Sequence, residues 1–152
     1  MLDIYVDADA CPVKDEVYRV ALRYDLAVFV VANTVLSVPA NSRIESVLVR
    51  ESSDAADDWI AERVGQDDIV ITSDVPLASR SLERGAAVIG PSGRPFTEDS
   101  IGAALASREL LSQLREIGEI TGGPAPFDRR DRSQFLQTLD QVIQKLKRRR
   151  SK

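Results

Sequence analysis

The chain passes from a strand to a helix at Val6-Asp7-Ala8-Asp9-Ala10-Cys11. An apolar run, residues 2–6, precedes this stretch, and Pro12 with an amphipathic helical pattern follows it. Two carboxylates therefore stand where a predicted strand ends, which is the sheet edge where open α/β folds bind ligands. Neighbouring carboxylates repel each other unless a cation or a shared proton relieves the repulsion. We therefore expect a functional carboxylate site here; the alternative is that Asp7 or Asp9 only caps the helix.

The composition describes an ordinary globular chain. Its 152 residues, 43% hydrophobic and 29% charged, are expected to form a single domain over residues 1–152. No apolar run is long enough to span a bilayer, and the N-terminus lacks the pattern of a signal peptide. The single cysteine, Cys11, agrees with a reducing compartment. The sequence thus predicts a cytoplasmic protein without a membrane partner.

The residues that the sequence lacks restrict the chemistry. There is no histidine, which excludes Ser-His-Asp and Cys-His catalysis and metal sites with histidine ligands. One cysteine builds neither a zinc cage nor a disulfide. Any bound metal must be held by oxygen ligands, which favours magnesium, manganese or calcium.

Charge is unevenly distributed along the chain. The net charge is −4, yet residues 145–152 carry six positive charges and no negative one. This basic C-terminal tail either contacts an RNA backbone or simply keeps the end of the last helix soluble. The sequence does not indicate an oligomeric state.

Apolar runs and helical periodicities alternate along the rest of the chain. Further strands are expected at residues 26–32, 44–49, 69–72 and 86–89. Helices are expected from Pro12, at 55–64, from Val75 to Gly85, from Thr97 or Ser100 to Ile117, and at 133–149. Residues 91–95 and 122–126 are interpreted as loops rich in proline and glycine. This order predicts an α/β fold, a three-layer α/β/α sandwich with a mostly parallel central sheet.

A second strand end repeats the pattern of the first. Asp74 follows the apolar strand 69–72 and precedes a helix, as Asp7 does. If the two strands are neighbours, Asp7, Asp9 and Asp74 meet at one crevice. Asp54 and Asp57 add a third contribution, because residues three apart at a helix start share a face. Helix capping and the helix dipole are the alternative for these two residues. The predicted metal ligands are thus Asp7, Asp9, Asp54, Asp57 and Asp74.

Motifs along nearly the whole chain resemble, in order, those of the uncharacterised bacterial YaiI/YqxD family. They lie at residues 6–14, 54–57, 68–78, 91–93, 122–124 and 131–135. More distantly, the chain is similar to PIN-like nuclease domains, which place one aspartate after the first strand, one at a helix start and one after a Thr-x-Asp strand end. This resemblance implies a PIN-like fold and catalytic roles for Asp7, Asp57 and Asp74.

The leading hypothesis is a ribonuclease that depends on Mg²⁺ or Mn²⁺. The carboxylates hold one or two ions, which activate water and stabilise the phosphate, so that no histidine base is needed. Lys14, Arg94 and Arg108 are candidate phosphate contacts, and Thr72 or Ser73 is a candidate for orienting ligands. As alternatives, Lys14 is solvated on its helix and Arg94 only stabilises its turn.

Two other functions remain open. A phosphatase of the haloacid dehalogenase type would use Asp7 as nucleophile and Asp9 as general acid/base. Such an enzyme also needs a mid-chain cation, usually lysine, and lysine occurs only at positions 14, 145, 147 and 152. A binding module for nucleic acid or protein is the other alternative, since the sequence has no clear counterpart of the further acidic residue that PIN-like enzymes usually hold on an intervening helix, and has few aromatic residues for base stacking. A titration with divalent cations separates these alternatives, because both enzymes need such cations and a binding module could lack affinity for them.

Overall fold

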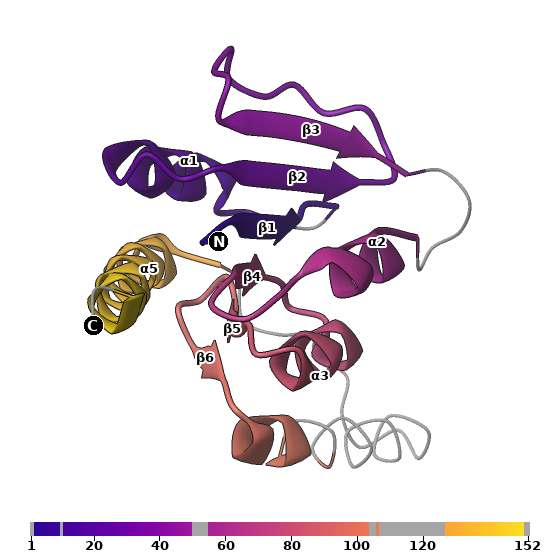
Figure 1. Ribbon diagram of the computed structural model, residues 1–152, viewed down its shortest axis with the longest axis vertical. Helices are drawn as coiled ribbons and strands as arrows, with labels where there is room; N and C mark the ends of the chain where they lie inside the picture. Colours follow the sequence, from indigo (N-terminus) through magenta and orange to yellow (C-terminus); the bar gives the residue numbers. More distant parts are fainter. Residues whose placement is uncertain (1, 10, 50–54, 104–105, 107–126, 151–152) are drawn as a thin grey trace.

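Strands and helices alternate along the chain (Figure 1). The computed structural model describes residues 2–9, 11–49, 55–103, 106 and 127–150. The elements are β1 (Ile4–Asp7), α1 (Lys14–Arg23), β2 (Val28–Ala32), β3 (Ile44–Leu48), α2 (Ala55–Arg63), β4 (Ile69–Ile71), α3 (Val75–Glu83), β5 (Ala87–Ile89), β6 (Pro95–Phe96) and α5 (Arg129–Arg150). Residues 98–103 are also helical.

The strands form one sheet in the order β3-β2-β1-β4-β5-β6. Strands β1 to β5 are parallel, and β6 pairs antiparallel with β5. From β1 the chain moves outward through β2 to β3, and then returns to place β4 on the other side of β1. The direction of winding therefore reverses between β1 and β4. Open α/β sheets bind ligands at this reversal, outside the carboxyl ends of the strands.

Helices cover both faces of the sheet, so the three-layer α/β/α prediction is confirmed. Figure 1 shows α1 and α5 on one face and α2 and α3 on the other. Side chains alternate between the two layers along β1: Ile4 and Val6 pack with α1 and α5, whereas Tyr5 packs with α2 and α3. Both faces are apolar because each is buried under helices, which explains the continuous apolar runs of the central strands.

An aromatic cluster fixes α2 on the sheet. The ring of Tyr5 stacks on Phe29 at 5.2 Å between centroids, and Trp59 of α2 lies 6.1 Å from each ring. Burial, the largest cause, and the charges of Asp68 and Asp3 raise the pKa of Tyr5 to about 12, so its hydroxyl is neutral. Aromatic pairs of this kind add about 0.5–1.5 kcal/mol beyond the area they bury. The cluster holds α2 against β1 and β2.

Two elements differ from the expected ones. Pro95 lies in the predicted loop 91–95 but belongs to β6, because the turn closes with hydrogen bonds from Gly93 N to Gly90 O and from Gly90 N to Arg94 O, each 2.9 Å. Helix α5 begins at Arg129, four residues earlier than predicted. Its start is a capping box: the Asp128 carboxylate accepts from Arg130 N and Asp131 N, and Asp131 accepts from Asp128 N.

Other boundaries lie close to their predicted positions. Helix α1 begins at Lys14 with Val13 at its N-cap, so Pro12 stands just before the helix rather than at its first position. The basic residues from Lys145 onward form the last turns of α5 and continue the helix up to Arg150. The predicted helix after Thr97 is seen at residues 98–103, and the rest of it, with the loop 122–126, lies outside the described residues. Among the described helices, none is long and apolar enough to cross a membrane.

Candidate active site

Two strand ends meet at the reversal point of the sheet. Asp7 is the last residue of β1, and Thr72 directly follows β4, the parallel neighbour of β1. Asp7 lies two residues after Tyr5, and Thr72 two residues after Val70, so strand alternation directs both side chains to the α2/α3 face. Residues 65 positions apart in sequence are thereby brought into contact.

A chain of hydrogen bonds joins these strand ends. The buried hydroxyl group of Thr72 donates to Asp7 Oδ2 at 2.8 Å. The same oxygen accepts from the backbone N–H of Asp74 at 3.0 Å. Thr72 therefore holds the Asp7 carboxylate at a fixed position relative to Asp74, the residue that directly precedes α3. The role of Thr72 or Ser73 in orienting ligands stays a prediction.

The electrostatic environment opposes the ionisation of Asp7. Burial is the largest cause that raises the pKa of this carboxyl group above its usual value, and the negative charges of Asp74 and Asp9 raise it further. The hydrogen bond from Thr72 acts in the opposite direction and favours the charged form. Asp7, Asp9 and Asp74 are therefore close enough to interact, and their mutual repulsion is what a bound cation would relieve.

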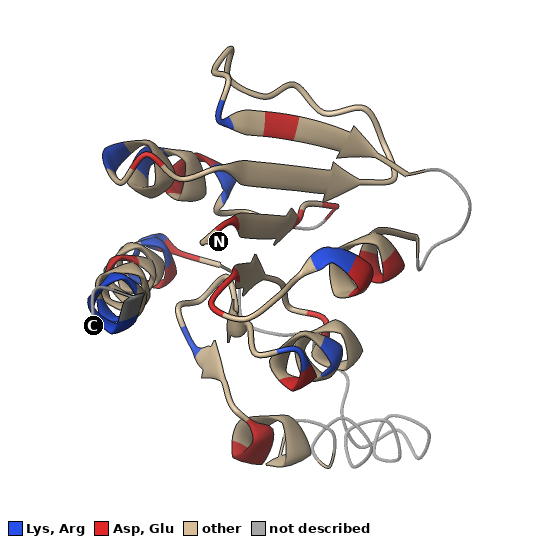
Figure 2. Cartoon of the chain, in the orientation of Figure 1, with Lys and Arg blue, Asp and Glu red and all other residues tan. Residues whose placement is uncertain are grey.

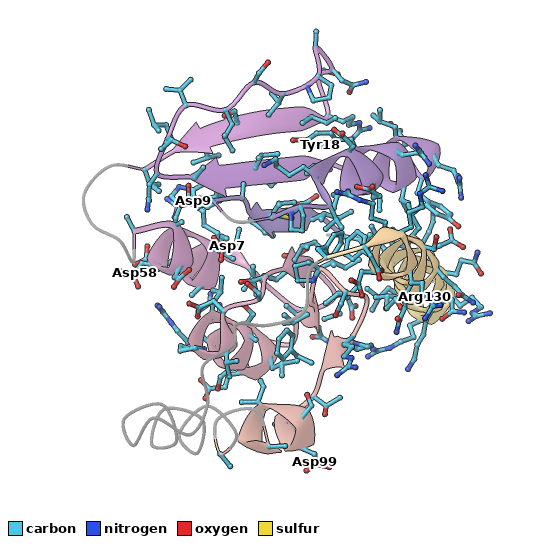
Figure 3. All side chains as sticks on the ribbon, turned by 180° about the vertical axis from the view of Figure 1, so that it is seen from behind. Asp7, Asp9, Tyr18, Asp58, Asp99 and Arg130 are labelled. Carbon is cyan, nitrogen blue, oxygen red and sulfur yellow. The ribbon has the colours of Figure 1, made fainter. Side chains whose placement is uncertain are left out.

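Asp9 is held by the neighbouring strand. Both of its carboxylate oxygens accept from the backbone N–H of Asn33, at 2.9 and 3.1 Å. Figure 3 shows Asp7 and Asp9 side by side at the ends of the strands. Neither of them caps α1, because its N-cap is Val13 and no side chain bonds to that helix end. The capping alternative for Asp7 and Asp9 is therefore wrong.

Asp74, in contrast, is a helix cap. Its Oδ1 accepts from the backbone N–H of Leu77 at 2.9 Å, at the start of α3. Asp74 Oδ2 accepts no hydrogen bond from the described residues. The carboxylate thus stabilises the helix with one oxygen and contributes its charge to the environment of Asp7.

Asn33 is a site residue that the sequence analysis did not identify. It follows β2, two residues after Val31, which packs on the α2/α3 side, so alternation directs its side chain to the face that carries Asp7. Its Oδ1 is buried and has no hydrogen-bond partner in the described part of the chain. A buried carbonyl oxygen without a partner is costly unless a donor or a cation reaches it. The signal available in the sequence was its position directly after the apolar run 26–32.

The remaining acidic candidates lie at the start of α2. Asp57 is half-buried in the first turn of α2, which contacts β1 and β2. Asp58 is exposed and pairs with Arg80 of α3 at 2.8 Å, so it links two helices. Asp54, a predicted ligand, lies outside the described residues.

The predicted substrate contacts fall in different surroundings. Lys14 is half-buried at the start of α1, where its charge lowers the pKa of Cys11 against the larger, raising effect of burial. Ser73 is exposed between Thr72 and Asp74. Arg94 is exposed opposite the end of β5; its carbonyl closes the turn, and its side chain makes no hydrogen bond to the described residues. Arg108 lies outside the described residues.

The donor set fits a cation of the magnesium type. In the parts of the chain that are described, no three acidic or cysteine side chains gather closely enough to form a metal cage. Magnesium does not require one, since it is usually held by one or two carboxylates with waters and substrate phosphates. Asp7 and Asp74 are the candidate carboxylate donors, and the unpartnered Oδ1 of Asn33 is a candidate neutral oxygen donor. These oxygen donors match the preference of a hard cation.

Comparison with known proteins places this chain among bacterial relatives of similar length. The model of the uncharacterised YaiI/YqxD family matches residues 5–145. A UPF0178 protein of Rhodospirillum centenum is 59% identical over 152 residues, which cover 97% of this chain and 99% of the relative. A UPF0178 protein of a Bradyrhizobium species is 57% identical over 150 residues, covering 99% and 92%. One of Rhodopseudomonas palustris is 59% identical over 145 residues, covering 95% and 94%. No solved structure matches the chain.

Proposed function

The chain belongs to the uncharacterised YaiI/YqxD family, and from the site it builds we propose that it is a divalent-metal-dependent ribonuclease. One observation carries this proposal: a hydrogen-bonded chain joins Asp7, Thr72 and Asp74 at the point where the winding of the sheet reverses. In open α/β sheets, ligands bind outside the strand ends at such a reversal. The choice of RNA as substrate follows from the distant resemblance to PIN-like nuclease domains.

The residues have distinct roles in this mechanism. Asp7 and Asp74 would hold Mg²⁺ or Mn²⁺, with Asp9, Asp54, Asp57 and the Asn33 side chain as further candidate donors. Thr72 orients the Asp7 carboxylate by donating to its Oδ2. A bound divalent ion supplies the Lewis acidity and the activated water that phosphodiester hydrolysis requires. Lys14 and Arg94 contact the phosphates of the substrate, and Arg108 is a further candidate.

The phosphatase alternative is less well supported. It requires Asp9 to transfer a proton next to a nucleophilic Asp7. Both oxygens of Asp9 instead accept from the Asn33 backbone, and α1 begins at Lys14 without an intervening flap. Trapping of a phosphoaspartate analogue at Asp7 with beryllium fluoride would favour this alternative.

The test is cleavage of a labelled RNA by the purified protein with Mg²⁺ or Mn²⁺. We expect cleavage by the unmodified protein that is lost on addition of EDTA. Asp7→Asn and Asp74→Asn should each lower the rate at least tenfold. Asp99→Asn is the matched control, because it removes one exposed carboxylate on helix 98–103, away from Asp7 in Figure 3. The proposal is wrong if both site variants cleave as fast as the control, or if the unmodified protein cleaves no RNA.

A further inference from the structure

Positive charge is concentrated in one of the three layers. Helices α1 and α5 together contain eleven lysines and arginines and only four acidic residues. The rest of the chain, which includes the candidate site, is therefore strongly acidic, since the whole chain has a net charge of −4. Figure 2 shows Lys and Arg at several places along α5. The molecule thus carries a basic helical layer and an acidic remainder.

The acidic side chains of α5 are engaged within the protein. Asp131 belongs to the capping box at the start of the helix. Asp140 accepts hydrogen bonds from Tyr24 and Gln144 and lies 3.7 Å from Arg23 of α1. These carboxylates therefore do not neutralise the outer surface of α5.

The outward face of α5 is a continuous stripe of cations and amides. We define the outer stripe as Arg130, Gln134, Gln137, Gln141, Lys145 and Arg148, all exposed and all within about 80° of each other around a helix of 3.6 residues per turn. It contains no acidic and no apolar residue. At 1.5 Å per residue it runs for about 27 Å. None of its three cations forms an ion pair with a described residue.

We propose that the outer stripe of α5 binds the phosphodiester backbone of a nucleic acid, independently of the carboxylate site. Cations neutralise phosphates, and glutamine amides donate to phosphate and sugar oxygens, so this composition suits backbone contact. A length of about 27 Å accommodates several successive phosphates of one strand. Figure 3 shows Arg130 on the far side of the molecule from Asp7 and Asp9, so binding here does not depend on the proposed function.

The same face is poorly suited to other anionic partners. Helices that insert into a membrane surface expose large apolar residues, whereas Phe135, Leu139 and Ile143 of α5 are fully buried against the sheet. Protein interfaces usually contain an aromatic anchor at their centre, and the outer stripe has glutamines there. The observations therefore favour a nucleic acid over a lipid surface or an acidic protein.

The test is the binding of a fluorescently labelled single-stranded RNA, followed by polarisation in EDTA, so that no metal is needed and no cleavage interferes. Arg130→Gln combined with Arg148→Gln should weaken binding at least about tenfold near 0.1 M salt. It should also reduce the slope of log Kd against log salt by about 1.4, or about 0.7 for each phosphate contact. The matched control combines Arg43→Gln with Arg80→Gln, which removes the same charge from exposed positions outside α1 and α5 and should change Kd less than twofold.

Three outcomes would overturn this proposal. The first is no RNA binding by the unmodified protein, and the second is equal weakening in the two double variants, which would indicate only an effect of net charge. The third is binding to vesicles containing anionic phosphatidylglycerol with no binding to RNA. Because the assay contains EDTA, it measures RNA binding without the metal ion on which the proposed function depends, so failure of one proposal is distinguishable from failure of the other.

Discussion

At the scale of single residues, the site depends on one carboxylate that the fold places in unfavourable surroundings. Asp7 is partly buried and near two other negative charges, and among the described residues the Thr72 hydroxyl group is what favours its charged form. Natural proteins retain such local costs mainly at functional positions. The sequence identified Asp7, Thr72 and Asp74 because each stands at the end of an apolar run. It did not identify the bond from Asn33 to Asp9, because that bond depends on the register between β1 and β2.

The first prediction concerns the pH dependence of stability. Because the pKa of Asp7 is raised in the fold, the folded chain binds this proton more tightly than the unfolded chain. The ionisation of Asp7 therefore lowers the free energy of unfolding as the pH rises from the ordinary aspartate pKa, about 3.9, through the folded pKa. The full cost is present at neutral pH. Asp7→Asn should raise Tm at pH 7 without divalent ions, and this gain should shrink as the pH falls through the folded pKa and be absent at about pH 3.9 and below.

Thermal unfolding followed by circular dichroism at both pH values measures this effect. Asp99→Asn provides the control, because it removes a carboxylate that is exposed on helix 98–103. A Tm of Asp7→Asn that is lower than that of the unmodified protein at pH 7 would contradict the electrostatic account of this residue.

At the scale of elements, helix starts and tight turns fix the strand ends in place. The apolar patterns predicted the strands and most helices, because burial on both faces of the sheet leaves long runs such as residues 26–32. They did not predict β6, because two residues that include a proline carry no periodic pattern. The start of α5 was missed by four residues, since its cap lies in the polar stretch before the first apolar position.

The second prediction separates the two roles of Asp74. Asp74→Ala removes the cap of α3 and should lower the free energy of unfolding by about 1 kcal/mol. Asp74→Asn keeps an oxygen that accepts from Leu77 N–H, so its stability should lie within a few tenths of a kcal/mol of the unmodified protein. Urea unfolding, followed by the fluorescence of Trp59, measures both. Equal destabilisation by the two substitutions would contradict the assignment of Asp74 as a cap.

The third prediction concerns the turn before β6. Gly93 has a φ of +88°, and a Cβ there would lie 2.7 Å from the backbone of Gln134 in α5. Thr138 also donates to Gly93 O at 2.8 Å, so the turn is fixed directly on the helix. Gly93→Ala should cost about 1–3 kcal/mol of stability from the backbone conformation alone.

Gly102 offers the matched control for this turn. It lies in helix 98–103, and a Cβ there would meet nothing within 4 Å. Gly102→Ala should therefore be neutral or stabilise the protein by up to about 1 kcal/mol. If Gly93→Ala were as stable as Gly102→Ala in urea unfolding, the close approach of the turn to α5 would not constrain the fold.

At the scale of the whole molecule, the sheet order gives the site its position. The sequence predicted a mostly parallel sheet but not which strands are neighbours, because pairing depends on contacts between distant segments. With β4 beside β1, aspartates from two halves of the chain meet at one edge, while the basic helices lie on one face of the sheet. From this arrangement we infer that the edge binds a hard divalent cation.

The most direct measurement of this claim is the titration of the purified protein with Mn²⁺, with free Mn²⁺ followed by electron paramagnetic resonance. We predict saturable binding by the unmodified protein, at least tenfold weaker binding by Asp7→Asn, and unchanged binding by Asp99→Asn. Mg²⁺ should compete for the same site. Equal Mn²⁺ affinity in the unmodified protein and Asp7→Asn, or no saturable binding at all, would contradict the account.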